Sequence, residues 1–334
     1  MPILNDHSDL PAASNRDAEG WAPDPEPIFG PLLIESLRLT KGQRLDKERH
    51  YVRPSDSLKC SRALSYIAAG APSEPMDPSG WWVTSLGTFI HELVGPAVED
   101  FFGPEHVTVE HEIGDPIYDD EGNRAGVRPH VVEVRGVSVP IVSYIDLWVH
   151  SPKLSLVTDF KSKGGYAYKL AVGERGAPEG PSRSELIQSG IGALIVGAEN
   201  VSVTYFAKEA ISKAVANRKG FDDWRRFTAE WTVPLDEIRT EVEDELLRMA
   251  AINRMWHEEQ TLAKRVIPGL PAEIADPTKG SWEQYGTTEN GESYLVNTGS
   301  AWNCSYCPWQ TLCAEHGPGR VANVNISTNR TETP

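Results

Sequence analysis

Apolar residues recur at helical spacing in four stretches of the chain and follow a strand-like pattern in four others. The helical stretches are residues 50–70, 85–102, 182–198 and 235–266. The strand-like stretches are residues 107–113, 140–149, 154–163 and 201–208. We expect Ser55 or Asp56 to cap the first helix. We expect the second helix to be interrupted or bent near Gly95 and Pro96, because proline removes a backbone hydrogen bond.

The order of these elements is helix, strands, helix, strand and helix. This order predicts an α/β or α+β fold with a mixed central sheet flanked by helices. Only HSPK separates the strands at 140–149 and 154–163, so we expect an antiparallel hairpin there. Residues 1–50 are acidic and rich in proline, and are expected to be an extension with little structure of its own. Residues 51–316 are the expected folded domain, and 317–334 a polar, disordered tail.

Charge is unevenly distributed along the 334 residues. The formal net charge of −16 argues against broad electrostatic binding to nucleic acid. Much of the acid, however, lies in the first 30 residues and in the segment LDEIRTEVEDEL. Residues 208–227 carry six basic side chains against three acidic ones. That segment forms either a local basic groove or a solvated helix face.

The chain starts without the basic and apolar regions of a secretory signal, and no apolar run reaches the roughly 18 residues of a membrane span. We therefore expect no membrane segment and a cytoplasmic location, in a bacterial cell or a phage-infected host. Thiols stay reduced in that compartment, so clustered cysteines more often bind metal than form disulfides.

Three of the four cysteines lie close together near the C-terminus, and the fourth lies far upstream. They are Cys304, Cys307, Cys313 and the distant Cys60. A disulfide interpretation leaves awkward partners and the wrong compartment. Judged on spacing alone, a four-thiolate zinc site and another metal centre are equal alternatives.

Charged residues interrupt the two apolar strands of the expected hairpin. Asp159 and Lys161 are two residues apart, so on a strand they project from the same face. Asp146 lies in an otherwise apolar strand, where a carboxylate is costly unless it is paired or binds a metal. If the strands pair, Asp146 and Asp159 approach each other, and a divalent cation would relieve their repulsion. Lys161 beside that cation would suit phosphodiester hydrolysis, and the alternative is a structural salt bridge.

Other polar residues add to this pattern. His91 lies on an otherwise apolar helix and is either a third metal ligand or a packed histidine. Gln188 heads an apolar helix, where it either donates to a phosphate or base or simply lies on the surface. Lys163 and Tyr166 follow the D-x-K strand and are either phosphate and stacking contacts for DNA or ordinary loop residues.

Taken in this order, the motifs resemble the RecB-like branch of the PD-(D/E)xK nucleases. GTFIHEL resembles that family's first motif, YIDLWV the second, and TDFKSK the D-x-K motif. RPSDSLKCSRALSY and NCSYCPWQTLC resemble the cysteine segments of the iron–sulfur subgroup, which includes the AddB nuclease domain and the CRISPR-associated Cas-four exonuclease family. The resemblance covers residues 51–316. It implies a restriction-endonuclease-like core, with an iron–sulfur clasp that joins its N- and C-terminal segments.

The resemblance implies roles for single residues. His91, Asp146 and Asp159 would bind magnesium or manganese. The backbone carbonyl of Phe160 would complete that metal site, and Lys161 would be the catalytic lysine. A [4Fe–4S] cluster would be bound by four cysteines, Cys60, Cys304, Cys307 and Cys313. A zinc ion at the same cysteines is the weaker alternative.

One helix departs from the family's pattern. Gln188 lies where the family's Q-x-x-x-Y motif begins and would contact DNA or the surroundings of the lysine. The family's tyrosine would fall on residue 192, which is glycine here. Contact between this helix and DNA is therefore in question.

The implied function is that of a metal-dependent DNA exonuclease acting on single strands or DNA ends in recombination, repair or replication, with a phage origin as one option. The alternative is a DNA-binding or adaptor module of a recombination or CRISPR-adaptation complex with little nuclease activity of its own. The intact metal-binding motifs argue against that alternative. A third reading, an iron–sulfur redox protein, lacks a recognisable electron-transfer motif. Expected partners are single-stranded DNA, further copies of the chain, or recombination and CRISPR proteins.

Overall fold

The computed structural model describes part of the chain. The described residues are 16–17, 20–21, 33, 36, 52–74, 78–257, 266–269, 282–287, 293–297, 307–317 and 320–322. Contacts divide the chain into two units, Met1–Lys47 and Glu48–Pro334. Within the described part of the first unit, β1 (Arg16–Asp17) pairs with β2 (Gly20–Trp21). Most of the expected extension and tail lies outside the described residues.

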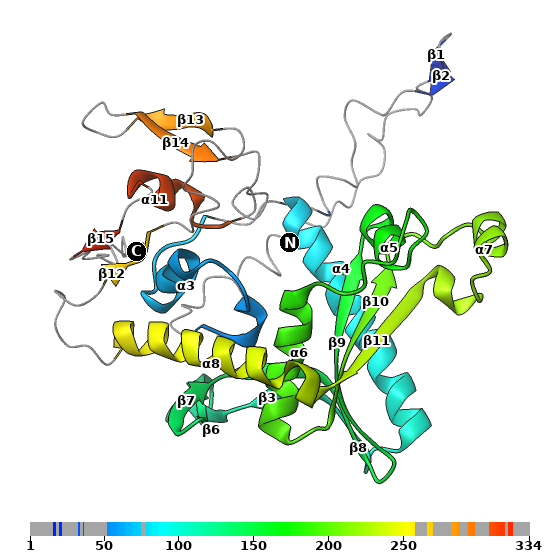
Figure 1. Cartoon of the computed structure of the whole chain (residues 1–334), viewed down its shortest axis with the longest axis horizontal. Helices are drawn as coiled ribbons and strands as arrows, with labels where there is room; N and C mark the ends of the chain where they lie inside the picture. The colour runs from blue at the N-terminus through cyan, green and yellow to red at the C-terminus, as the bar shows by residue number, and fades with distance from the viewer. Residues whose placement is uncertain are drawn as a thin grey trace, which may run out of the picture. The chain divides into compact units, whose positions relative to one another are not determined.

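A five-stranded mixed sheet lies at the centre of the second unit, with the strand order β11-β10-β9-β8-β3 (Figure 1). Its strands are β3 (Val107–Ile113), β8 (Ser143–Ser151), β9 (Leu154–Lys163), β10 (Asn200–Ala207) and β11 (Thr228–Pro234). The pair β9–β10 is parallel, and the other neighbouring pairs are antiparallel. The mixed sheet and the β8–β9 hairpin therefore confirm the prediction.

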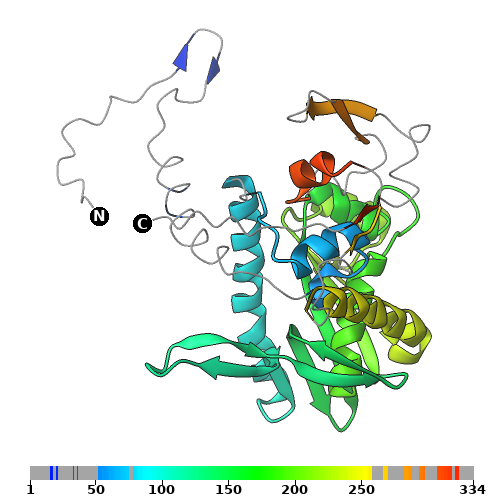
Figure 2. The same ribbon diagram turned by 90° about the vertical axis from the view of Figure 1, so that its left-hand side faces the viewer.

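Helices surround this sheet (Figure 2). The described helices are α3 (Ser61–Ala68), α4 (Pro78–Phe102), α5 (Gly165–Ala171), α6 (Arg183–Val196), α7 (Lys213–Lys219), α8 (Leu235–His257) and α11 (Gln310–Glu315). Two 3-10 turns are η2 (Pro54–Asp56) and η3 (Trp224–Arg226).

The two faces of the sheet bury different helices. Neighbouring residues on a strand point to opposite faces. On β9, Leu156 belongs to a cluster that Val94 and Val98 of α4 pack against. The next residue, Val157, belongs to the main core with Ile191 of α6, and with side chains of α3 and α8. The sheet is therefore flanked by α4 on one face and by α6 on the other.

Separate two-stranded sheets complete the described structure of the second unit. They pair β4 (Asp115–Tyr118) with β5 (Arg124–Arg128), β6 (His130–Val134) with β7 (Val137–Ile141), β12 (Val266–Ile267) with β15 (Val321–Ala322), and β13 (Trp282–Thr287) with β14 (Ser293–Asn297).

The structure differs from two expectations for the helices. Helix α4 continues through Pro96, so the expected interruption does not occur there, while the expected bend stays a prediction. Proline removes only one backbone hydrogen bond, and the packing of Val94 and Val98 holds both halves of the helix on the sheet. The cap of α3 is also different, because Cys60 Sγ accepts a hydrogen bond from the Ala63 amide at 3.4 Å. Asp56 instead lies in η2.

Helix α6 approaches α8 closely at Gly190. A Cβ atom at Gly190 would lie 2.6 Å from Val242 Cγ2 and 3.1 Å from Ile238 Cδ1. Both neighbours are buried on α8, so they have little freedom to move aside. Glycine at this position therefore sets the distance between the two helices.

We expect Gly190→Ala to lower the free energy of unfolding by about 1–3 kcal/mol, the usual cost of overpacking a core. Chemical denaturation followed by circular dichroism will measure the change. Gly126→Ala is the control, because a Cβ at Gly126 would meet nothing within 4 Å. Equal stability of the Gly190 variant and the wild type would contradict the close approach.

Candidate active site

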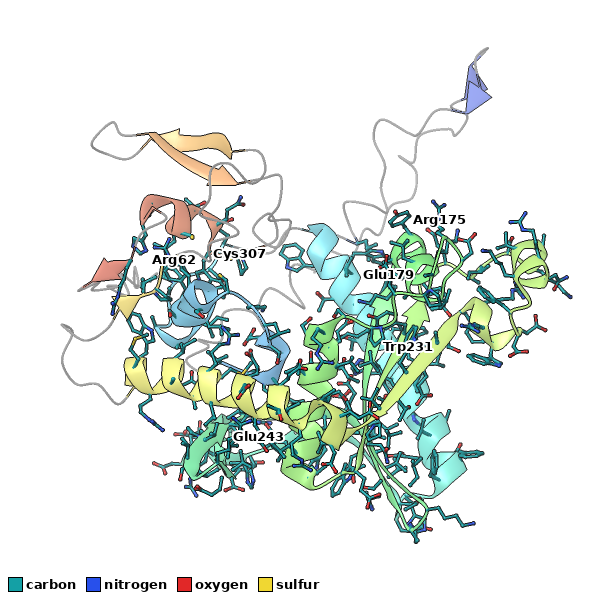
Figure 3. The ribbon with its side chains drawn as sticks, viewed as in Figure 1. Arg62, Arg175, Glu179, Trp231, Glu243 and Cys307 are labelled. Atoms are coloured by element: carbon teal, nitrogen blue, oxygen red, sulfur yellow. The ribbon has the colours of Figure 1, made fainter. Side chains whose placement is uncertain are left out.

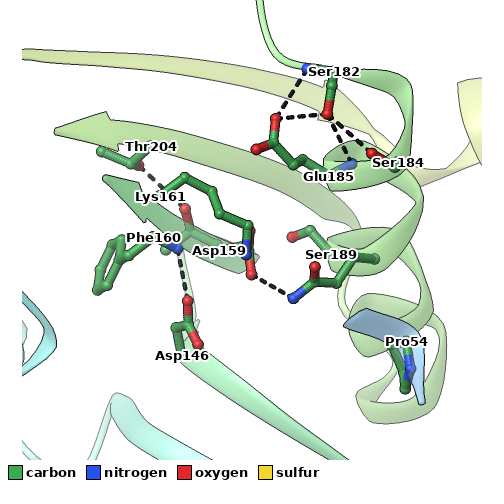
Figure 4. A network of polar contacts seen from close by, with 12 residues as sticks. Pro54, Asp146, Asp159, Phe160, Lys161, Ser182, Ser184, Glu185, Ser189 and Thr204 are labelled. Atoms are coloured by element: carbon green, nitrogen blue, oxygen red, sulfur yellow. Dashed lines mark hydrogen bonds and ion pairs between the residues drawn. The ribbon is translucent and has the colours of Figure 1, made fainter. Parts of the chain in front are cut away.

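The β8–β9 hairpin ends in two carboxylates. The last pair of the ladder at this end joins Leu147 to Thr158, so Asp146 and Asp159 are the next residues on the two strands. Asp146 Oδ2 accepts a hydrogen bond of 2.7 Å from the Phe160 amide (Figure 4). The Asp146 side chain thus replaces a backbone carbonyl of β8 as the acceptor for this amide, at the point where the β8–β9 pairing ends.

Asp159 is buried and held by two donors. Lys161 Nζ lies 2.6 Å from Asp159 Oδ2, which places both side chains on the same face of β9. Gln188, on α6, donates from Nε2 to Asp159 Oδ1 at 2.8 Å. Since the amide of Gln188 is bound to a carboxylate, this residue orients Asp159 in the present structure.

Helix α4 contributes His91 to the same end of the hairpin. Its Nε2 lies 3.7 Å from Asp146 Oδ2, and its Nδ1 lies 2.6 Å from Glu110 Oε1. One ligand atom from each of His91, Glu110 and Asp146 lies within 4.8 Å of the others, a spacing that can hold a metal ion. The imidazole and two carboxylates are suitable ligands for a divalent cation.

Sequence reasoning did not identify Glu110. This residue lies on β3, between the pairs Val109–Leu147 and His111–Ile145, which places it opposite Asp146. Its φ of 50° lies in the left-handed region, which a residue with a side chain seldom adopts. Such a conformation costs of order 1–3 kcal/mol and tends to occur at functional sites. Only the pairing of β3 with β8 could have revealed it, because the alternating pattern of VTVEHEI marks no residue as special.

The carboxylates carry perturbed acidities. Burial raises the pKa of Asp159 to about 7, and the charge of Asp146 adds to the rise while Lys161 opposes it. Burial also raises the pKa of Asp146, against the opposing effect of His91. Burial alone would lower the pKa of His91, but the negative charges of Asp146 and Glu110 outweigh it and raise that pKa. A bound cation would relieve this repulsion between carboxylates.

The binding of Mg²⁺ or Mn²⁺ is expected to strengthen as the pH rises from about 6 to about 8. The folded protein keeps a proton on Asp159 up to a pKa of about 7 and on His91 above its usual pKa, and each ligand must lose its proton to bind metal. Below the pKa of Asp159, about 7, affinity should rise about tenfold per pH unit for the proton that Asp159 releases, and the proton of His91 adds to this dependence. Calorimetric titrations in two buffers of different ionisation enthalpy will report both the metal affinity and the number of protons released. An affinity independent of pH, with no proton release, would show that these groups are not ligands.

Two residues proposed for DNA contact are not part of the His91–Glu110–Asp146 group. Lys163 Nζ is 2.7 Å from Glu185 Oε1 and 4.3 Å from the centroid of the Tyr205 ring. It is therefore part of a buried polar network. Tyr166, by contrast, is 64% exposed, with the Arg175 guanidinium 5.2 Å from its ring centroid.

Gly192 is buried against the sheet. A Cβ at this position would lie 3.2 Å from Ile145 Cγ1 and 3.3 Å from Val157 Cγ1. A tyrosine at residue 192 would enter the core, so this position of α6 is not available for contact with DNA.

Three thiols lie near the N-terminal end of α3, where Cys60 is the capping residue. Among the described cysteines, Cys60, Cys307 and Cys313 are free and partly buried. Burial raises the pKa of the Cys307 and Cys313 thiols, and the other thiols of the group raise it further. Cys304 lies outside the described residues. The chain therefore brings residues from its two ends together, and thiol donors of this kind suit zinc or an iron–sulfur cluster.

A buried arginine ties these segments to one another. Arg62 is 0% exposed. Its Nη1 donates to Cys313 Sγ at 3.5 Å and to the Gly317 carbonyl, and its Nε donates to the Pro268 carbonyl at 3.0 Å. Figure 3 labels Arg62 of α3 and Cys307 of the segment that leads into α11. The guanidinium lowers the pKa of the Cys313 thiol and supplies positive charge to the thiol group.

Further hydrogen bonds join the same segments. Tyr66 Oη and His316 Nδ1 are 2.8 Å apart, and the Trp309 indole donates to the Ala71 carbonyl at 3.1 Å. The Glu74 amide donates to the Pro308 carbonyl at 2.7 Å. Residues around α3 and α11 are thus held together by their own contacts as well as by the thiols.

Comparisons with known proteins gave distant structural likenesses. No family model matches the chain, and no curated protein matches it. The crystal structure of SSO0001 aligns over 86% of this chain and 98% of its own, with 15% identity and a TM-score of 0.42. The alkaline exonuclease LHK-Exo from Laribacter hongkongensis aligns over 63% of this chain and 91% of its own, with 11% identity and a TM-score of 0.36. Its complex with dAMP aligns with 12% identity and a TM-score of 0.33. None of the described helices is long and apolar enough to cross a membrane.

Proposed function

We propose that the protein is a metal-dependent deoxyribonuclease that hydrolyses phosphodiester bonds, acting as an exonuclease on single strands or ends. The observation that carries the proposal is the meeting of His91, Asp146, Asp159 and Lys161 at one end of the β8–β9 hairpin. These groups come from three separate elements of the fold. Burial of Asp159 and its repulsion with Asp146 cost free energy that a simple structural salt bridge would not, which favours a functional role for the group.

His91, Asp146 and Asp159 would hold Mg²⁺ or Mn²⁺, with the Phe160 carbonyl as a further ligand. Glu110 is added to this set by its position beside His91. When bound, the ion polarises the phosphoryl oxygen and favours ionisation of the attacking water. The protein's own contribution is to fix these ligands, through the Phe160 amide on Asp146 and the Gln188 amide on Asp159.

Lys161 is the residue that would act on the substrate. The side chain is held within 2.6 Å of Asp159. Although burial works against its charge, the carboxylates of Asp159 and Asp146 raise its pKa, so it stays protonated at neutral pH. A fixed ammonium group here would stabilise the negative charge that develops on the phosphate in the transition state.

The thiol group would hold a [4Fe–4S] cluster through Cys60, Cys307, Cys313 and Cys304, with zinc as the alternative. Its role would be structural, since it lies with α3 and α11 and its ligands come from opposite ends of the nuclease core. We further propose that the protein acts in recombination, repair or replication.

The test is degradation of end-labelled single- and double-stranded DNA with Mg²⁺, Mn²⁺ or EDTA, using protein purified without oxygen. We expect cleavage only with the cations, and none with Asp146→Asn. Asp119→Asn is the matched control, because Asp119 lies in the exposed turn between β4 and β5. Equal cleavage by wild type and Asp146→Asn would assign the activity to a contaminant. Binding of DNA by the wild type without any cleavage would support an adaptor function instead.

A further inference from the structure

Exposed aromatic and basic side chains gather beyond the carboxyl end of β9 and β10, where Figure 1 shows α5 and α7. We call this region the α5–α7 surface. Its exposed aromatic and basic residues include Tyr166, Lys213, Arg218, Lys219, Trp224 and Phe227, and the acidic residues Glu209, Asp222 and Asp223 are exposed in the same segment.

This surface begins next to the proposed catalytic strand. Lys161 is paired with Tyr205 across β9 and β10, and two residues further on Lys163 is paired with Ala207. The Ala207 amide donates to the Phe227 carbonyl at 2.8 Å. Phe227 therefore lies across the sheet from Lys163, next to Ala207. Lys161 is only two residues before Lys163 on β9.

The α5–α7 surface has a rigid base. A small core joins Tyr168 and Ala171 of α5 to Ala216 of α7 and to strands β10 and β11. The hydroxyl of Tyr168 donates to the Arg225 carbonyl in η3 at 2.8 Å. The exposed rings are thus mounted on packed elements, so their separation is fixed before any partner binds, which reduces the entropic cost of binding.

Three large rings on this surface are left open to water. The exposed fractions are 64% for Tyr166, 52% for Trp224 and 50% for Phe227. In a chain with a net charge of −16, the segment 208–227 is locally basic, with six basic and three acidic side chains. Lys213, Arg218 and Lys219 are exposed on α7, in the same segment as Trp224 and Phe227. An apolar partner would leave that charge without a counter-charge, whereas the phosphates of a nucleic acid would pair with it.

Stacking rings and backbone-binding cations together are the chemistry that holds single-stranded nucleic acid. We propose that the α5–α7 surface is a second contact site for single-stranded DNA, which guides the strand to Lys161. This inference rests on the proposed nuclease function. It adds a site for the part of the strand that lies outside the metal centre.

The test measures binding of fluorescein-labelled oligothymidylate by anisotropy in EDTA, where no cleavage occurs. Trp224→Ala is expected to weaken binding about tenfold, as expected for the loss of one stacked base. Trp224→Phe should restore most of it. The matched control is Trp82→Ala, because Trp82 is similarly exposed, at 47%, but lies on α4.

Charge is tested separately with Arg218→Gln combined with Lys219→Gln. Loss of two phosphate contacts should reduce the slope of log affinity against log salt by about 1.4. With Mg²⁺, the Trp224 variant should lose cleavage of long strands but retain that of tetranucleotides, which also shows that it is folded.

The outcomes separate the two proposals. If the wild type cleaves DNA and the Trp224 and charge variants bind as tightly as Trp82→Ala, the α5–α7 surface is not a contact site and the nuclease function stands. If the wild type neither binds nor cleaves DNA, both proposals fail. A preference of the surface for an acidic protein over oligothymidylate in competition would also overturn the inference.

Discussion

Lys161→Met is expected to slow DNA cleavage by a factor of about 10² to 10³, the usual effect of removing one preorganised charge from an active site. The ammonium group lies against Asp159 Oδ2, at 2.6 Å. Methionine keeps the length and apolar stem of the side chain and removes only the charge. Single-turnover assays with end-labelled DNA at saturating Mn²⁺ will measure the rate of the chemical step.

Metal binding should survive the Lys161 substitution. Loss of a positive charge beside Asp159 leaves the carboxylates less compensated, so calorimetry should show Mn²⁺ affinity that is unchanged or stronger. Lys153→Met is the matched control, because Lys153 lies exposed at the closed end of the same hairpin. Full activity of the Lys161 variant, together with an inactive Asp146→Asn, would remove the lysine from the mechanism and leave the metal site in place.

The second large effect is expected at the thiol group. Cys313→Ser should abolish binding of the metal or cluster and open the contact between α3 and α11. Structural thiolate sites contribute on the order of 10–16 kcal/mol of apparent binding free energy, comparable with the whole stability of a domain. Metal analysis, visible absorbance and calorimetric melting of protein purified without oxygen will measure the loss.

The same preparation distinguishes the two metals. A brown wild type with broad visible absorbance contains an iron–sulfur cluster, whereas a colourless one with stoichiometric zinc contains a zinc site. Thr311→Ser is the control, because Thr311 lies on the same helix and is exposed. If Cys313→Ser keeps its metal and its melting temperature, the thiols are not ligands.

Local patterns predicted much of the sheet. β9 begins and ends at the predicted residues 154 and 163, because a run of apolar and β-branched residues bounded by a short turn leaves little choice of structure. The spacing of Asp159 and Lys161 likewise fixed their common direction, since side chains on a strand alternate. Helix α6 begins at Arg183, one residue after the expected start, because Ser182 is its capping residue.

Features that depend on pairing were not predictable in the same way. Glu110 joins the site only because β3 lies beside β8, and its left-handed backbone depends on that neighbourhood. Strand β11 escaped notice because its alternating residues are half exposed at the edge of the sheet. Residue 192 was expected to bear on DNA contact, and only the packing of Ile145 and Val157 shows that it faces the core.

The meeting of Cys60 with Cys313 has a consequence for the biosynthesis of the protein. Roughly 250 residues must be translated between these two ligands, which takes about 10–50 s at 5–20 residues per second. During that interval α3 exists without Arg62's partners at Cys313 and Gly317, while the hairpin that carries Asp146 and Asp159 is already complete. If the thiol group binds a metal or cluster as proposed, binding can be completed only after Cys313 has been translated, later than the strands that carry Asp146 and Asp159. A chain that lacks this metal or cluster would contain the acidic site but not the contact between α3 and α11. Its thiols would then be open to oxidants, and the segments that carry them would be open to proteases.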